Sequence, residues 1–436
     1  MRINKIAAVM CLVCLFSACT GRTDNNSEGI TSEITMETTK NTDTAEPEIF
    51  DRFDGVRAMT PFYQGNTVYG ETVMFIDRKD RKQLLFDPDE ILSVRSYDLK
   101  TEYVRGKDYD LDKDGRLILT EGSSIPCITQ EVFYGAGENS ILVTKNREGK
   151  PVKTYWGEGE MMTKWQVSVT YTHSGEWSGF RQENSGEFAA FLKKLKNGEN
   201  VTVMFYGDSI TYGASASFID GYAPHQLSWS QLAVQKLAAE YGYSVHYVDP
   251  ALGNTARVPE DVKYGARGVI TYINPSVGGW TVADGISNFD RHVKDFIGKY
   301  GCDLFVTAFG MNDAGRAPDD ERAMIRGIAD RVLAEKPDAS VMLVSTMVPN
   351  PAAENGWCGN QALFEKGFMS LAEDYRRAGV PCGVTRMTSV SLALLERKDF
   401  CDYSGNNINH PNDFMVRIYA QSFYEALAGY ENAKNS

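Results

Sequence analysis

From residue 187 to residue 428, strand-like apolar runs alternate with helical segments, and this alternation constrains the fold more than any other feature. The first run is Val201–Tyr206, and further runs follow at 245–248, 269–273, 303–309 and 341–346. Strands that alternate with helices return in the same direction, so they form a parallel sheet covered by helices on both faces. The pattern therefore predicts an α/β fold with three layers, α/β/α.

The chain between residues 49 and 185 follows a shorter period. Its apolar and polar residues alternate over short runs, which is typical of half-buried strands. Two of these runs, 109–111 and 117–119, flank an Asp-Lys-Asp-Gly turn, which predicts a hairpin. We therefore expect a β-sandwich domain, jelly-roll-like, over 49–185, followed by the α/β domain over 186–436.

The N-terminal residues are typical of an export signal. Two basic residues precede an apolar run from Ile6 to Phe16, and small residues lead to Cys19. This ending resembles a bacterial lipobox, in which cleavage frees a cysteine that then carries lipid. We expect residues 1–19 to be a lipoprotein-type signal with Cys19 as the lipid-bearing residue, and the polar residues 20–48 to be a disordered tether. The expected location is the bacterial cell surface or periplasm, and secretion without an anchor is the alternative.

Composition excludes some partners. The net charge of −13 argues against nucleic acid and against an anionic membrane surface. Hydrophobic residues make up 42% of the chain, which allows a sizeable core. The cysteines after the signal lack metal-ligand spacing, and a pairing of Cys382 with Cys401 stays open. We therefore expect neither a metal nor a cofactor.

Four short motifs stand out in the α/β region. Gly207-Asp208-Ser209-Ile210 follows the first strand and presents a serine at its carboxyl end, where open α/β sheets bind ligands. Gly278-Gly279-Trp280-Thr281 and Gly310-Met311-Asn312-Asp313 follow later strands, and His410-Pro411 precedes the last helix. We expect Asp208 and Asp313 to fix turns rather than to act as acids. A serine hydroxyl is a weak nucleophile, so Ser209 needs an imidazole within hydrogen-bond reach.

In this order the motifs resemble the four signature blocks of the SGNH, or GDSL, hydrolase superfamily, over roughly residues 187–430. The resemblance implies a flavodoxin-like sheet and ester hydrolysis by Ser209 and His410. It also implies an oxyanion hole, in which preorganised donors stabilise the negative charge that develops on the substrate oxygen. The donors are the backbone N–H groups of Ser209 and Gly279 and the side-chain amide of Asn312. Gly253, in a similar stretch, is the alternative to Gly279.

His410 is the histidine best placed to act on Ser209, because it lies on a polar turn before the last helix. The superfamily's orienting acid stands three residues before the histidine, and here that position holds Asn407. An amide oxygen can accept a hydrogen bond from the imidazole, as in Cys-His-Asn enzymes, so Asn407 is the predicted orienting group. The alternatives are Asp402 or Asp413 in that role, or a Ser-His dyad.

The superfamily includes lipases, thioesterases and carbohydrate esterases, so the resemblance implies a reaction class but not a substrate. Export, a tether and a preceding β-rich domain resemble carbohydrate esterases that deacetylate polysaccharides. Trp280 and Trp357 offer rings that can stack on a sugar. We expect removal of O-acetyl or other short acyl groups from a carbohydrate through an acyl-enzyme. The alternatives are a glycan-binding lipoprotein with little turnover and a short-chain lipid ester hydrolase, and the oligomeric state stays open.

Overall fold

The computed structural model describes residues 59–136, 140–145, 149–184, 186–351 and 358–430. The predictions for Cys19, for the tether and for Trp357 therefore lie outside the described residues. Residues Pro47–Ser436 form one compact unit. Within the described ranges, the helices are too short or too polar to cross a membrane.

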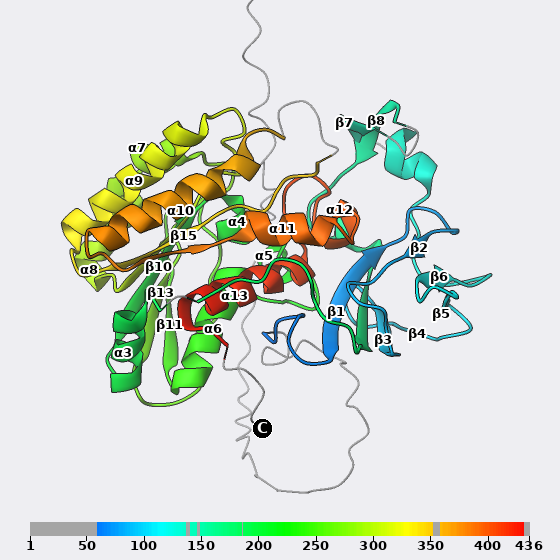
Figure 1. Ribbon diagram of the computed structural model, residues 1–436, viewed down its shortest axis with the longest axis horizontal. Coiled ribbons are helices and arrows are strands. Elements are labelled where there is room, and N and C mark those ends of the chain that lie inside the picture. Colours follow the sequence, from blue (N-terminus) through cyan, green and yellow to red (C-terminus); the bar gives the residue numbers. More distant parts are fainter. Residues whose placement is uncertain (1–58, 137–139, 146–148, 185, 352–357, 431–436) are drawn as a thin grey trace, which may run out of the picture. The chain divides into compact units, whose positions relative to one another are not determined.

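The larger sheet comprises β10 (Val201–Gly207), β11 (Ser244–Val248), β12 (Val262–Lys263), β13 (Val269–Ile273), β14 (Leu304–Ala308), β15 (Ser340–Val344) and β16 (Cys382–Thr385). The strand order is β12-β11-β13-β10-β14-β15-β16, and β12 is antiparallel to β11 while the other pairs are parallel. β10 lies between β13 and β14, so the carboxyl ends of the three strands meet at one edge (Figure 1). The predicted parallel sheet is confirmed, and β12 and β16 are additional strands. Cys382 and Cys401 are both free thiols.

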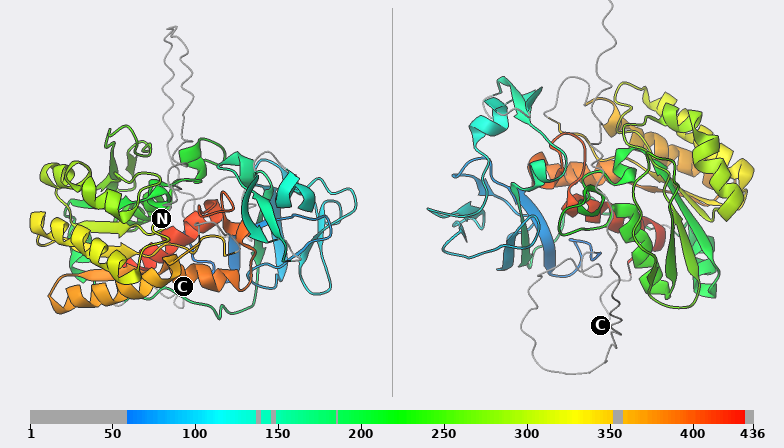
Figure 2. Two further views of the ribbon diagram at one scale, coloured as in Figure 1. Left: turned by 90° about the horizontal axis from the view of Figure 1, so that it is seen from above. Right: turned by 180° about the vertical axis from the view of Figure 1, so that it is seen from behind.

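Two helical layers cover this sheet, because successive side chains of a strand point to opposite faces. Val203 and Phe205 of β10 share a core with α6 (Trp229–Tyr241) and α13 (Asp413–Ala428). Met204 and Tyr206 share the other core with α7 (Val282–Ser287), α8 (Asp295–Tyr300), α9 (Pro318–Glu335) and α10 (Gln361–Arg377). Figures 1 and 2 show the two layers. The remaining helices are α3 (Ala189–Asn197), α4 (Ser209–Tyr212), α5 (Ser217–Asp220), α11 (Met387–Leu395) and α12 (Phe400–Tyr403), with a π-helical segment at Asp290–Lys294.

The preceding region is rich in antiparallel strands. It comprises β1 (Thr67–Met74), β2 (Arg81–Lys82), β3 (Glu90–Ser96), β4 (Glu102–Tyr103), β5 (Tyr109–Leu111), β6 (Leu117–Leu119), β7 (Ser140–Lys145), β8 (Pro151–Tyr155), β9 (Gln166–Thr172), α2 (Glu160–Thr163) and a π-helical turn at Val132–Ala136. The sheets have the orders β1-β9-β3-β4, β2-β6-β5 and β7-β8. The β-rich region ahead of the α/β region is therefore confirmed, and the predicted hairpin is β5 paired with β6.

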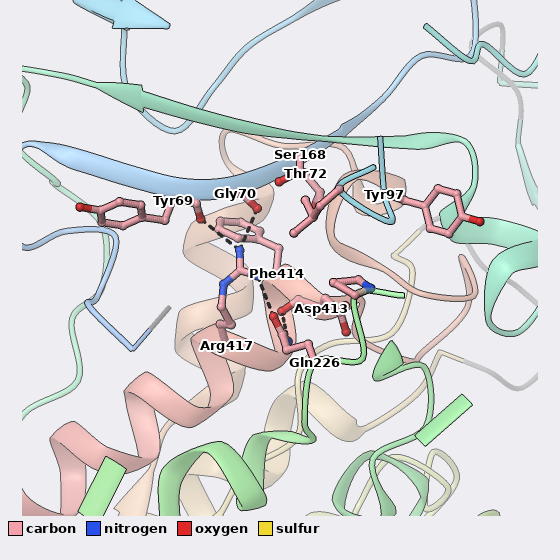
Figure 3. Close-up of a pocket in the computed structure, with 11 residues that line it drawn as sticks. Tyr69, Gly70, Thr72, Tyr97, Ser168, Gln226, Asp413, Phe414 and Arg417 are labelled. Atoms are coloured by element: carbon pink, nitrogen blue, oxygen red, sulfur yellow. Dashed lines mark hydrogen bonds between the residues drawn. The ribbon is translucent and has the colours of Figure 1, made fainter. Parts of the chain in front are cut away.

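Buried polar contacts join the β-rich region to the α/β region. Lys398 forms an ion pair with Glu71 in which both side chains are fully buried, and the hydroxyl of Tyr171 also donates to Glu71. Arg417 of α13 lies between the two regions and donates to the backbone carbonyl oxygens of Tyr69 and Gly70 (Figure 3). A buried charge that loses its partner is costly, so these contacts hold the two regions in one arrangement.

Candidate active site

Ser209 lies directly after β10, at the carboxyl edge of the larger sheet. A Cβ on Gly207 would lie 2.4 Å from the carbonyl oxygen of Ala308, so only glycine allows the turn to pass this close to β14. Asp208 caps α4, accepting a hydrogen bond from a backbone N–H of that helix at 3.0 Å. It also accepts from the N–H of Met311 at 3.3 Å. Asp208 is therefore a turn residue, as predicted.

His410 contacts Ser209 from the loop that precedes α13. Its Nε2 lies 2.9 Å from Ser209 Oγ. Its Nδ1 lies 2.9 Å from Oε2 of Glu158. The three side chains thus form a continuous chain of hydrogen bonds from hydroxyl through imidazole to carboxylate. A histidine held in this way can take the serine proton as a general base.

Glu158 comes from the β-rich region, between β8 and α2. Its Oε2 also accepts a hydrogen bond from Ser215 Oγ, and its Oε1 accepts one from Asn406 Nδ2, each at 3.0 Å. Desolvation would raise the pKa of Glu158, but the charge of His410 and these hydrogen bonds outweigh it and lower the pKa to about 2. Burial would lower the pKa of His410, but the ionised Glu158 outweighs it and raises that pKa above its ordinary value.

The prediction that Asn407 orients His410 is wrong. Asn407 Nδ2 donates to the carbonyl oxygen of Tyr155 at 3.0 Å and to Thr154 Oγ1 at 3.2 Å, so its amide binds β8. Its backbone is left-handed, with φ of 65°, a conformation that Asn tolerates better than most residues. Asn407 therefore fastens the histidine loop to the strand that leads to Glu158.

The alternative acids are also engaged elsewhere. Asp402 pairs with Lys82 at 2.8 Å, and Asp413 accepts from the backbone N–H of Ser217 at 2.9 Å. The dyad alternative does not describe the site either, because the Glu158 carboxylate occupies the position that an orienting acid needs.

The turn with Gly278 and Gly279 lies beside the nucleophile. The N–H of Val277 donates to the carbonyl oxygen of Gly207 at 3.3 Å, and a Cβ on Gly278 would lie 3.9 Å from that of Ser209. Gly279 has φ of 78°, which glycine adopts without strain. The contact with Ser209 is made by Gly278, so the choice of Gly279 over Gly253 as a backbone donor stays a prediction.

Asn312 links the second and third motifs, because its Nδ2 donates to the carbonyl oxygen of Trp280 at 2.9 Å. An amide nitrogen carries two N–H groups, so the second can serve a substrate oxygen. Asp313 accepts from the N–H of Val282 at 3.1 Å and pairs with Arg316 at 2.8 Å. Asp313 therefore fixes the loop, as predicted.

The Trp280 ring is partly buried and packs against the core of the α/β region. Its centroid lies 4.6 Å from that of His292, which is itself buried and hydrogen-bonded through Nδ1 to the carbonyl oxygen of Pro275. The ring contact of Trp280 with His292 and the hydrogen bond of His292 to Pro275 support the turn that carries Gly279. Trp280 therefore has a packing role, and its stacking on a sugar stays a prediction.

The family model for GDSL-like lipases and acylhydrolases matches residues 203–422, just over half of the 436-residue chain. The chain belongs to the GDSL-like lipase/acylhydrolase family. Ser209, Asn312 and His410 lie inside the segment matched to this GDSL family, whereas Glu158 lies before it.

Solved structures similar to this GDSL family member include three esterases. A two-domain esterase active on acetylated mannans is 17% identical with a TM-score of 0.40, and the match covers 57% of this chain and only about half, 55%, of that one. An acetyl xylan esterase is 16% identical with a TM-score of 0.36, covering 52% and 98%. A family 3 carbohydrate esterase from Clostridium thermocellum is 13% identical with a TM-score of 0.36, covering 52% and 95%. No curated protein gives a significant match.

Glu158 is not among the residues predicted from the sequence, because the GDSL pattern places the orienting acid close to His410. The two residues are 252 positions apart. The only local signal is a carboxylate between Gly157 and Gly159, of which the second has φ of 56°. Such a turn is too common to identify an acid, because glycine marks tight turns of many kinds.

Proposed function

We propose that the protein is a serine ester hydrolase in which Ser209, His410 and Glu158 form the catalytic triad. The observation that carries this proposal is the hydrogen-bonded chain of the three side chains, with 2.9 Å at each of its two contacts to His410. Membership in a family of lipases and acylhydrolases supports the same class of reaction.

In this reaction Ser209 Oγ attacks the ester carbonyl while His410 Nε2 takes its proton. Glu158 holds the imidazole in the required tautomer and stabilises the imidazolium that forms. The N–H groups of Ser209 and Gly279 and the amide of Asn312 donate to the oxyanion, and one such donor contributes about 2.7–4 kcal/mol. His410 then protonates the leaving alcohol, and a water molecule activated by His410 hydrolyses the acyl-enzyme.

For the substrate we propose a short acyl group, acetyl above all, on a carbohydrate hydroxyl. The export motif that ends at Cys19 and the preceding β-rich region support this class, because polysaccharides are substrates found outside the cell. The alternative of a glycan-binding protein with little turnover depends on Asn407 standing where the superfamily has its orienting acid. Glu158 removes that reason.

The test uses the chain from Pro47 onward, which forms one compact unit. We expect it to hydrolyse 4-nitrophenyl acetate faster than its longer acyl homologues. We expect Ser209→Ala to lower kcat by several orders of magnitude while the circular dichroism spectrum stays unchanged. Absence of serine-dependent release from every homologue would contradict the proposal, and release that rises with acyl length would favour a lipid ester. Acetylated polysaccharides are then assayed for acetate release.

We also propose that the protein is exported and lipid-anchored at Cys19. The apolar run from Ile6 to Phe16 and the small residues before Cys19 support this. Mass spectrometry of the membrane fraction tests it: a diacylglyceryl modification on Cys19 is expected, and Cys19→Ala should release the protein from that fraction.

A further inference from the structure

The Glu158 side chain is partly exposed where it contacts His410. Its side chain is 47% exposed, whereas that of His410 is 13% exposed. A glutamate on a loop has three rotatable bonds, and an exposed one keeps most of its rotamer freedom. A carboxylate in this position needs other groups to hold it against the imidazole.

Two buried side chains hold Glu158 by hydrogen bonds. One comes from the segment that follows Ser209, and the other comes from the loop that carries His410. Ser215 follows α4, which Ser209 opens, and its Oγ donates to Glu158 Oε2 at 3.0 Å. Asn406 lies in the loop that carries His410, and its Nδ2 donates to Glu158 Oε1 at 3.0 Å. Ser215 is fully buried and Asn406 is 2% exposed, so both donors are themselves fixed.

The other end of the Asn406 amide organises the histidine loop. Its Oδ1 accepts hydrogen bonds from the backbone N–H groups of Ile408, Asn409 and His410, at 2.9, 2.9 and 3.0 Å. One side chain thus sets the backbone position of His410 through its oxygen and the position of Glu158 through its nitrogen. The distance between the acid and the base depends on both ends of a single planar amide.

We propose that Asn406 and Ser215 are positioning residues that hold the Glu158 carboxylate against His410 Nδ1, one at each carboxylate oxygen. The inference rests on the proposed function only for its effect on rate, because the position of Glu158 can be measured without turnover. Two other carboxyl groups act on His410 electrostatically, Asp208 beside Ser209 and Asp220 at the end of α5, and the variants below leave both in place.

The test is the pKa of His410, followed by NMR of histidine-labelled protein. Because Glu158 raises the pKa of His410, loss of its position should lower that pKa. We expect Asn406→Ala to lower the pKa of His410 by about half a unit or more in the wild-type background. In the Glu158→Gln background, the same substitution should lower the pKa of His410 by less than about 0.2 units. In the kinetic assay Asn406→Ala should lower kcat about 10-fold or more and leave KM within about 2-fold.

Ser215→Ala serves as the second variant, because it removes the other donor without disturbing the hydrogen bonds within the histidine loop. It should lower the His410 pKa in the same way, again only when Glu158 is present. The matched control is Asn412→Ala, which removes an equally buried amide two residues beyond His410, where its Nδ2 contacts Thr72 and Gln166. Asn412→Ala should change the His410 pKa by the same amount in the wild-type background and in the Glu158→Gln background.

An unchanged His410 pKa in Ser215→Ala and in folded Asn406→Ala would overturn the inference. Equal pKa changes with and without Glu158→Gln would also overturn it, because they would show a general loosening of the loop. The proposed function fails separately, through a wild-type protein that hydrolyses no ester, and the NMR titration remains readable in that case.

Discussion

Glu158 Oε2 lies 2.9 Å from His410 Nδ1, although 252 positions separate the two residues. Glu158 comes from the β-rich region, whereas His410 and Ser209 come from the α/β region. The site is therefore complete only when both regions have folded onto each other. The arrangement of the site therefore also depends on the buried contacts between the two regions, such as the ion pair of Lys398 with Glu71.

Glu158→Gln should lower kcat by up to roughly 10⁴-fold, because the amide no longer stabilises the imidazolium and can favour the wrong tautomer. His410 must be neutral to take the serine proton, so activity rises as pH rises through its pKa. Glu158 raises that pKa, so Glu158→Gln should move the acid limb of the kcat/KM profile to lower pH. An acid limb that stays in place would show that Glu158 does not act on His410.

Asn407→Asp should not raise activity. If Asn407 oriented His410, an aspartate in its place would preserve or increase activity. It replaces an N–H donor by an oxygen that faces the carbonyl oxygen of Tyr155, so we expect a loss of about 1–3 kcal/mol in the free energy of unfolding. Urea titration measures this loss. Asn407→Gly, which suits φ of 65° and adds no charge, is the control and should be the milder change. A gain in kcat for Asn407→Asp would speak against the assignment of Glu158.

Lys398→Met should lower the free energy of unfolding by about 3–5 kcal/mol, because it leaves the buried Glu71 carboxylate without its counter-ion. Urea unfolding of the chain from Pro47 onward measures the loss. Combining it with Glu71→Gln should restore part of the stability, since the uncompensated charge is then absent. If Lys398→Met alone is as stable as the wild-type protein, the ion pair does not hold the two regions together.

Glu321→Gln should flatten the dependence of stability on pH. Burial, together with Asp313 and Asp208, raises the pKa of Glu321 to about 8 despite Arg316. The folded protein therefore keeps a proton that the unfolded chain loses above its ordinary pKa of 4.5, and stability falls as pH rises toward 8. Melting temperatures at pH 6 and pH 8 test this, with Glu373→Gln on the exposed surface of α10 as control. Equal decreases in wild type and Glu321→Gln would contradict the prediction.

The α/β fold and the candidate site residues Ser209, Asn312 and His410 could be predicted from the sequence. For Ser209 and Asn312 the reason is that parallel strands bring their carboxyl ends to one edge of the sheet. Ser209 and Asn312 follow strands that are neighbours in the sheet, and their motifs are short and local. β16 escaped prediction because it has only four residues, of which one is Gly383. The contact of Glu158 with His410 escaped because it depends on how two separately patterned regions pack, which no local spacing encodes.

The division of the proposed triad between two regions has a consequence for inheritance. A recombination event that exchanged the N-terminal half of this chain for another β-rich segment would leave Ser209 and His410 intact and remove Glu158. Such a hybrid would keep its hydrolase motifs and lose its acid, unless the new segment placed a carboxylate at the same point. The two halves are therefore expected to be passed on as a single unit, with Glu158 changing only in step with the loop around Asn406.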